Sequence, residues 1–113
     1  MRKLKIIALA VSSLFPLPAQ TGPTGGLSGV VTDPSGLVVS GATIRMKHLE
    51  TGLARQVLSN QEGYWEVRFL PVGRYRVEIE AGGFQKVVRT EVPVESAVVS
   101  SLRTQLQLGS VSD

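Results

Sequence analysis

Short segments of alternating apolar and polar residues, separated by turn residues, fill the chain between Gly29 and Phe84. Alternation with period two is the pattern of a strand that buries one of its faces. Glycine, proline, asparagine and aspartate recur between the segments at near-regular spacing, which is typical of a β-sandwich or barrel. We predict an all-β fold with seven strands, over residues 27–32, 42–49, 53–58, 64–69, 74–81, 84–92 and 98–108.

The same alternation predicts which side chains form the core. In the strand over 64–69, Trp65, Val67 and Phe69 share one face, and Tyr64 points the other way into water. In the last strand, four apolar residues align on one side. The other predicted inward positions are Ala42, Ile44, Met46, Tyr75, Val77, Ile79, Val98, Leu102, Leu106 and Leu108.

The first nineteen residues have the order of a secretory signal peptide. Met1–Lys5 is basic, Ile6–Leu14 is apolar but short, and the small residue Ala19 follows two prolines. This segment holds three of the twelve basic residues, which leaves nine against the nine acidic ones. A mature chain of balanced charge gives no support to nucleic-acid binding, so we expect no nucleic-acid partner.

These boundaries divide the chain into four parts. We predict a signal peptide over residues 1–19, a flexible linker over 20–26, one β-sandwich domain over 27–108 and a short tail over 109–113. The chain contains no cysteine, so a domain exported to an oxidising compartment must be held together by its core alone.

An ordered set of short motifs along the chain resembles the carboxypeptidase regulatory-like domain, a seven-stranded antiparallel Greek-key sandwich of the transthyretin type. The similarity covers residues 27–108, and Pro71 and Gly73 would form a tight crossing before the fifth strand. The residues that carry the resemblance have structural roles: Gly29, Asp33, Gly36, Gly41, Ala42, Gly63, Trp65, Leu70, Pro71, Gly73, Tyr75, Gly83 and Phe84.

A signal peptide followed by this domain is similar to the N-terminal extension of Oar-like TonB-dependent outer-membrane receptors. The resemblance implies a non-catalytic interaction or spacer domain in the periplasm or outer membrane, with a protein partner such as a receptor plug, a barrel or another envelope protein. It implies membrane association only through a larger parent protein. No plug or barrel segment occurs in these 113 residues. We therefore expect a fragment of such a receptor or a stand-alone exported module.

The family name suggests zinc peptidase chemistry, but the residues argue against any enzyme. A catalytic zinc site uses three protein ligands, whereas His48 is the single histidine and cysteine is absent. No Gly-x-Ser-x-Gly motif accompanies His48, so serine catalysis has no nucleophile elbow. We expect His48 to be a half-buried structural residue, and we expect no metal, no cofactor and no catalytic site.

Two alternatives to the interaction domain remain at this stage. A carbohydrate-binding module of the starch-binding type would need exposed aromatic rings, and Tyr64 is the aromatic residue predicted to face outward. An accessory domain of a secreted peptidase would use the same sandwich. The mixed charges of the strand faces suit either a solvated surface or a protein-interaction face, and edge strands offer β-augmentation.

Overall fold

The computed structural model describes residues 22–109, which form seven strands and no helix within that range. The part of the chain described therefore has no helix able to cross a membrane. The strands are β1 (Thr24–Thr32), β2 (Thr43–His48), β3 (Ala54–Leu58), β4 (Tyr64–Pro71), β5 (Gly73–Glu80), β6 (Val87–Val94) and β7 (Val99–Gln105). The predicted signal peptide lies outside the described residues, as does the tail after Gly109.

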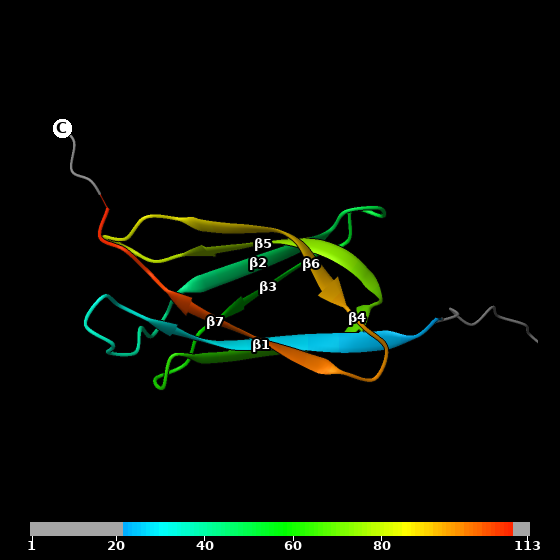
Figure 1. Ribbon diagram of the computed structural model, residues 1–113, viewed down its shortest axis with the longest axis horizontal. Coiled ribbons are helices and arrows are strands. Elements are labelled where there is room, and N and C mark those ends of the chain that lie inside the picture. The colour runs from blue at the N-terminus through cyan, green and yellow to red at the C-terminus, as the bar shows by residue number, and fades with distance from the viewer. Residues whose placement is uncertain (1–21, 110–113) are drawn as a thin grey trace, which may run out of the picture.

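The strands form two sheets that face each other, as Figure 1 shows. One has three strands in the order β4-β1-β7, and the other has four in the order β3-β2-β5-β6. This arrangement confirms the predicted β-sandwich. The pairs are antiparallel with one exception: β7 runs parallel to β1. The antiparallel arrangement that we expected is therefore wrong at this pair. After β6 the chain crosses to the other sheet, where β7 lies beside β1 on the side away from β4 and runs in the same direction as β1.

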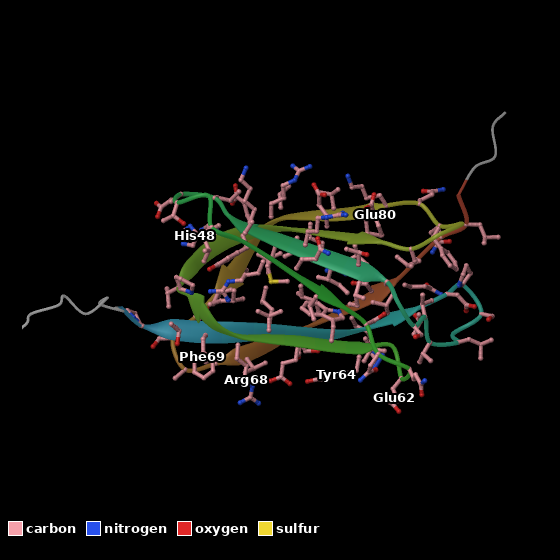
Figure 2. All side chains as sticks on the ribbon, turned by 180° about the vertical axis from the view of Figure 1, so that it is seen from behind. His48, Glu62, Tyr64, Arg68, Phe69 and Glu80 are labelled. Atoms are coloured by element: carbon pink, nitrogen blue, oxygen red, sulfur yellow. The ribbon has the colours of Figure 1, made fainter. Side chains whose placement is uncertain are left out.

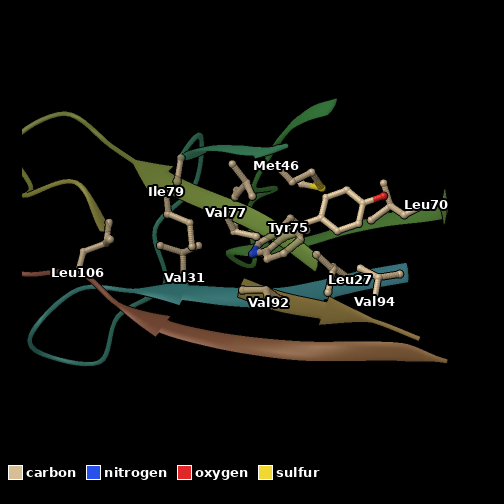
Figure 3. Close-up of a cluster of buried hydrophobic side chains, with 13 residues drawn as sticks. Leu27, Val31, Met46, Leu70, Tyr75, Val77, Ile79, Val92, Val94 and Leu106 are labelled. Atoms are coloured by element: carbon tan, nitrogen blue, oxygen red, sulfur yellow. The ribbon is translucent and has the colours of Figure 1, made fainter. Parts of the chain in front are cut away.

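The core lies between the two sheets (Figure 3). Tyr75, Val77 and Ile79 of β5 pack toward Leu27 and Val31 of β1, and all five are fully buried. The predicted inward positions of β2 and β5 are thus confirmed. Burying side chains of this size contributes about 1.5–3 kcal/mol each, which is the main stabilising term for a domain without a disulfide. Ala42, Ile44, Met46, Trp65, Leu70, Val92, Val94 and Leu106 complete the buried set.

Several strand ends differ from the prediction. β1 begins at Thr24, so the last residues of the predicted 20–26 linker belong to the sheet. β6 continues through Pro93 to Val94 instead of covering residues 84–92. Proline is tolerated there because β6 is an edge strand, where an N–H can be missing on the open side. β7 is shorter than the predicted strand, so Val98 and Leu108 lie outside it. Both side chains are exposed, although they were predicted to face inward.

The largest correction concerns the end of β4. Phe69 was predicted to face inward with Trp65, but it is 74% exposed and Leu70 is buried instead. The pairing of β1 with β4 shifts between Gly25 and Leu27, as at a β-bulge, and an extra residue in β4 reverses the parity after Val67. β4 then curves toward β5, as Figure 1 shows, and pairing is interrupted only at Val72 rather than over residues 70–73.

Candidate interaction surfaces

Four of the predicted motif residues lie at the crossing from β4 to β5: Leu70, Pro71, Gly73 and Tyr75. Gly73 and Tyr75 lie against the ring of His48. The Tyr75 hydroxyl donates a 2.7 Å hydrogen bond to the Pro71 carbonyl, which fixes the chain on both sides of Val72. The rings of His48 and Tyr75 meet edge to face at 4.9 Å. Burial raises the pKa of Tyr75, which keeps its hydroxyl as a donor. This corner is a structural clamp that joins β4 to β5.

His48 is buried more completely than predicted, with 4% of its surface exposed. Its Nδ1 accepts the backbone N–H groups of Glu50 at 3.1 Å and Thr51 at 3.2 Å. The ring proton therefore lies on Nε2, which is 3.1 Å from the Val72 carbonyl oxygen and donates to it. Both ring nitrogens are engaged by the backbone. Among residues 22–109, no three His, Cys, Asp or Glu side chains lie close enough together to hold a metal ion.

Gly29 and Trp65 form a second structural contact, at the centre of the three-stranded sheet. A Cβ atom on Gly29 would lie 2.8 Å from Trp65 Nε1 and would overlap the Leu102 carbonyl oxygen. Glycine is required here because the indole ring and β7 both approach the β1 backbone closely. The indole N–H is buried and has no acceptor among the residues described.

The remaining motif residues lie mainly at the end of the sandwich away from His48, in turns. Asp33 Oδ1 accepts hydrogen bonds from the backbone N–H groups of Ser35 and Leu37, and the bond from the Ser35 hydroxyl lowers the pKa of the Asp33 carboxyl most. Phe84 forms an isolated bridge with Leu108. Ala42 is fully buried. Gly36, Gly41, Gly63 and Gly83 all have positive φ angles.

An exposed apolar surface surrounds Phe69 at the other end of the three-stranded sheet. We define the Phe69 surface as Phe69 with Thr24, Ala97, Val98 and Val99, which line a hollow of about 230 Å³ together with Gly25 and Arg68. Phe69 and Ala97 have φ angles of 60° and 61°. A bulky residue in this left-handed region is a backbone outlier, and such strain persists where the surrounding structure imposes it, often at functional sites.

Charged side chains continue this surface along β4. The Tyr64 hydroxyl donates a 2.6 Å hydrogen bond to Glu66, and Arg68 forms an ion pair with the same carboxylate. The bond from Tyr64, followed by that from Arg68, lowers the pKa of Glu66. Figure 2 shows Tyr64, Arg68 and Phe69 on the side of the molecule opposite Glu80. Two aromatic rings therefore flank a polar pair on the outside of β4.

We predict that Phe69→Asn stabilises the isolated domain. Asparagine tolerates the left-handed conformation better than a bulky residue, for which it costs roughly 1–2 kcal/mol, and the exposed ring contributes little packing. Urea unfolding should show a gain of about 1 kcal/mol. A lower midpoint for Phe69→Asn than for the wild type would mean that the ring serves folding rather than binding.

The outer face of the four-stranded sheet carries a second hollow, of about 430 Å³. Charged side chains of β2 and β5 surround it, and Ala54 of β3 leaves space beside them. Glu78 lies among the cations, and its hydrogen bonds with Arg76 and then Lys86 lower its pKa. The residues that line it are Arg45, Met46, Lys47, Ala54, Arg76 and Glu78.

Sequence reasoning missed the Phe69 surface, and it predicted outward charges on the second face without the hollow or the pairing between strands. The exposure of Phe69 follows from a change of spacing in β4. The inward residues Val67 and Leu70 are three positions apart, which breaks the period of two and indicates a bulge. The opposition of Lys47 to Arg76 depends on strand register, which no local pattern specifies.

Comparison with known families identifies the fold. The sequence profile of the carboxypeptidase regulatory-like domain family matches residues 26–107. No curated protein sequence matches the chain.

Solved structures show the same sandwich at low sequence identity. The Bacillus anthracis TIE protein has a TM-score of 0.66 and 19% identity, over 76% of this chain and 17% of its own length. Catechol 1,2-dioxygenase from Pseudomonas arvilla C-1 has a TM-score of 0.65 and 14% identity, over 82% of this chain and 55% of its own length. The minor pilin GBS52 of Streptococcus agalactiae has a TM-score of 0.60 and 12% identity, over 81% of this chain and 48% of its own length. The chain spans less than two thirds of each of these proteins, and the similarity shows the fold alone.

Proposed function

Because the chain belongs to the carboxypeptidase regulatory-like domain family, we propose that it is a non-catalytic interaction domain. In this proposal the domain is exported and forms the N-terminal extension of a TonB-dependent outer-membrane receptor or a truncated form of one. Its partner is an envelope protein, either the receptor's own plug and barrel or a neighbour. The domain binds that partner without chemistry of its own.

The Phe69 surface is the observation that carries this proposal. Phe69 is the most exposed large apolar side chain among the residues described, at 74%, and its backbone is strained. Val98 and Val99 beside it are 43% and 46% exposed. Contiguous exposed apolar groups mark interaction sites, and aromatic anchors provide much of the energy of protein interfaces. A pure spacer would gain nothing from a strained, exposed phenylalanine.

Native complex size tests the proposal. The exported chain, extracted from the cell envelope in mild detergent, should elute above the size of a monomer, and Phe69→Asn should elute as the monomer. Leu37→Asn removes an equally prominent apolar group, 67% exposed, from the opposite end of the sandwich and should behave as wild type. A monomeric wild type, or the same complex for all three chains, would contradict binding of a separate envelope protein through Phe69.

One observation favours carbohydrate as a second candidate ligand. Tyr64 and Phe69 both lie on the outer side of β4 with Glu66 and Arg68 between them, so two rings are exposed where one was predicted. Trp65, the larger ring, is buried and unavailable to a sugar. Binding to soluble and insoluble glycans that Tyr64→Ala abolishes would favour a sugar ligand over a protein partner.

Export leads to a prediction about the mature N-terminus. We expect cleavage after Ala19, which leaves Gln20 as the first residue, because a basic start, an apolar run and a small residue occur in that order. N-terminal sequencing of protein recovered from the envelope measures this directly. An intact Met1 on that protein would remove the basis for export.

The proposed lack of catalytic activity leads to another prediction. The mature chain should cleave no peptide with a free C-terminus, with or without zinc, and should bind zinc only weakly. His48 has both ring nitrogens engaged by the backbone, and a catalytic zinc site normally uses three protein ligands. Calorimetric titration with zinc, next to a peptidase assay, measures both properties. A stoichiometric site of sub-micromolar affinity that His48→Ala abolishes would contradict the non-catalytic assignment.

A further inference from the structure

Two cations oppose each other on the outer face of the four-stranded sheet. Lys47 of β2 is the direct register partner of Arg76 of β5. Both side chains point outward, since their neighbours Met46 and Val77 are fully buried on the other face. Like charges in directly opposite positions destabilise an antiparallel pair. The pair therefore favours any negative charge that lies between its two members.

The two carboxylates beside this pair are already bonded to arginines, and one of them is bonded to Arg76 itself. Glu78 accepts a 2.9 Å hydrogen bond from Arg76 Nε, and Glu80 accepts a 2.7 Å bond from Arg45. Within residues 22–109, Lys47 forms no ion pair. Arg76 uses Nε for Glu78, which leaves its terminal nitrogens available as donors. The opposed pair thus has unused donors on both sides.

A hollow of suitable charge lies at the same place. The register partner of Lys47 on its other side is Ala54, whose small side chain leaves the 430 Å³ hollow open beside the pair. Three cations and one carboxylate line this hollow, a net charge of +2. Lys86 and Glu80 flank the hollow with opposite charges: Lys86 pairs with Glu78 at 3.3 Å and Glu80 pairs with Arg45 at 2.7 Å, so including both leaves the net charge at +2. A phosphate monoester carries about −1.5 to −2 at pH 7 and matches this charge.

We propose that this hollow binds a phosphate-bearing ligand, with the phosphate group between Lys47 and Arg76 and with Arg45 at its rim. An arginine fork and a lysine point charge are the two side chains that proteins use most directly for phosphate. The phosphate can belong to a soluble compound or to a lipid headgroup that ends in a phosphate monoester, because both present the same three oxygens and the same charge. This site lies on the sheet opposite the Phe69 surface and is independent of it.

Two titrations of the exported chain test the site and distinguish the two sources. Inorganic phosphate is added at constant ionic strength, with chloride as the balancing anion, and binding is followed by NMR. Sedimentation with vesicles that contain phosphatidic acid, compared with vesicles of phosphatidylcholine alone, tests the lipid source. We expect Lys47→Gln and Arg76→Gln to weaken binding about tenfold, as for loss of a hydrogen bond to a charged group. The matched control Arg103→Gln removes an exposed cation of β7 and should bind as wild type.

Unfolding provides a second readout that a general salt effect would not give. Without phosphate, Lys47→Gln should raise the urea midpoint, because it removes the opposition to Arg76. Phosphate should then raise the midpoint of the wild type and of Arg103→Gln, but not that of Lys47→Gln. Equal responses of all three chains, or no binding to either phosphate source, would overturn the proposal. Binding to one source only, dependent on Lys47, would support it and identify that source.

Discussion

Trp65→Ala is expected to destabilise the domain by about 3–5 kcal/mol, the cost of truncating a large aromatic side chain in a core. The indole ring is 2% exposed and packs against Gly29, which has no side chain to fill the space. Leu102 and β7 lie on the far side of that glycine, so the cavity would open at the centre of the three-stranded sheet. Urea unfolding followed by circular dichroism measures the loss.

Tyr64→Ala is the matched control, because it truncates the neighbouring aromatic residue on the opposite face of the same strand. Tyr64 is 39% exposed and its hydroxyl bonds to Glu66 at the surface, so its truncation should cost about 1 kcal/mol or less. If Tyr64→Ala proved the more costly change, the register of β4 would be off by one residue.

Gly73→Ala is expected to cost about 3 kcal/mol or more. The added methyl group would overlap His48 Nε2 and lie 2.8 Å from Cε1, and the ring cannot move away because both its nitrogens are bonded to the backbone. Gly73 also has a φ angle of 149°, which side chains rarely adopt. Overpacking and backbone strain each cost about 1–3 kcal/mol. Thermal unfolding followed by circular dichroism measures the change.

Gly82→Ala controls for the general effect of replacing a glycine. A Cβ atom at Gly82 would meet nothing within 4 Å, and its φ angle is not positive. This variant should retain the wild-type stability or gain slightly, because alanine restricts the unfolded chain. Equal losses for Gly73→Ala and Gly82→Ala would show that the clamp under His48 is not what requires glycine.

The parts of the fold that local patterns specify were predictable from the sequence. β2 and β5 alternate strictly, and their inward residues Ile44, Met46, Tyr75, Val77 and Ile79 are all buried as predicted. The alternating segments and turn residues predicted seven strands, and the family resemblance favoured a sandwich over a barrel. Gly29 was recognised as a motif residue, but its reason, the closeness of Trp65 and β7, is visible only in the structure.

The candidate surfaces depend on features that the sequence expresses weakly. The bulge near Phe69 inverts the faces of β4 over a few residues, and simple alternation cannot predict it. Pairing of β1 with β7 joins segments more than seventy residues apart, so neither its direction nor its register follows from local signals. The opposition of Lys47 and Arg76 has the same origin: each charge alone is an ordinary outward residue.

Site-specific crosslinking tests the central claim, binding through the Phe69 surface, most directly. A photoreactive benzoylphenylalanine would replace Phe69 in the full-length chain in its own cells, and Leu37 in a parallel strain. Both positions are exposed, but only position 69 belongs to the proposed interface. We predict one dominant crosslinked envelope protein, or a crosslink to a plug or barrel of the same polypeptide, from position 69 and none from position 37. The same products from both positions, or no product from position 69, would contradict the claim.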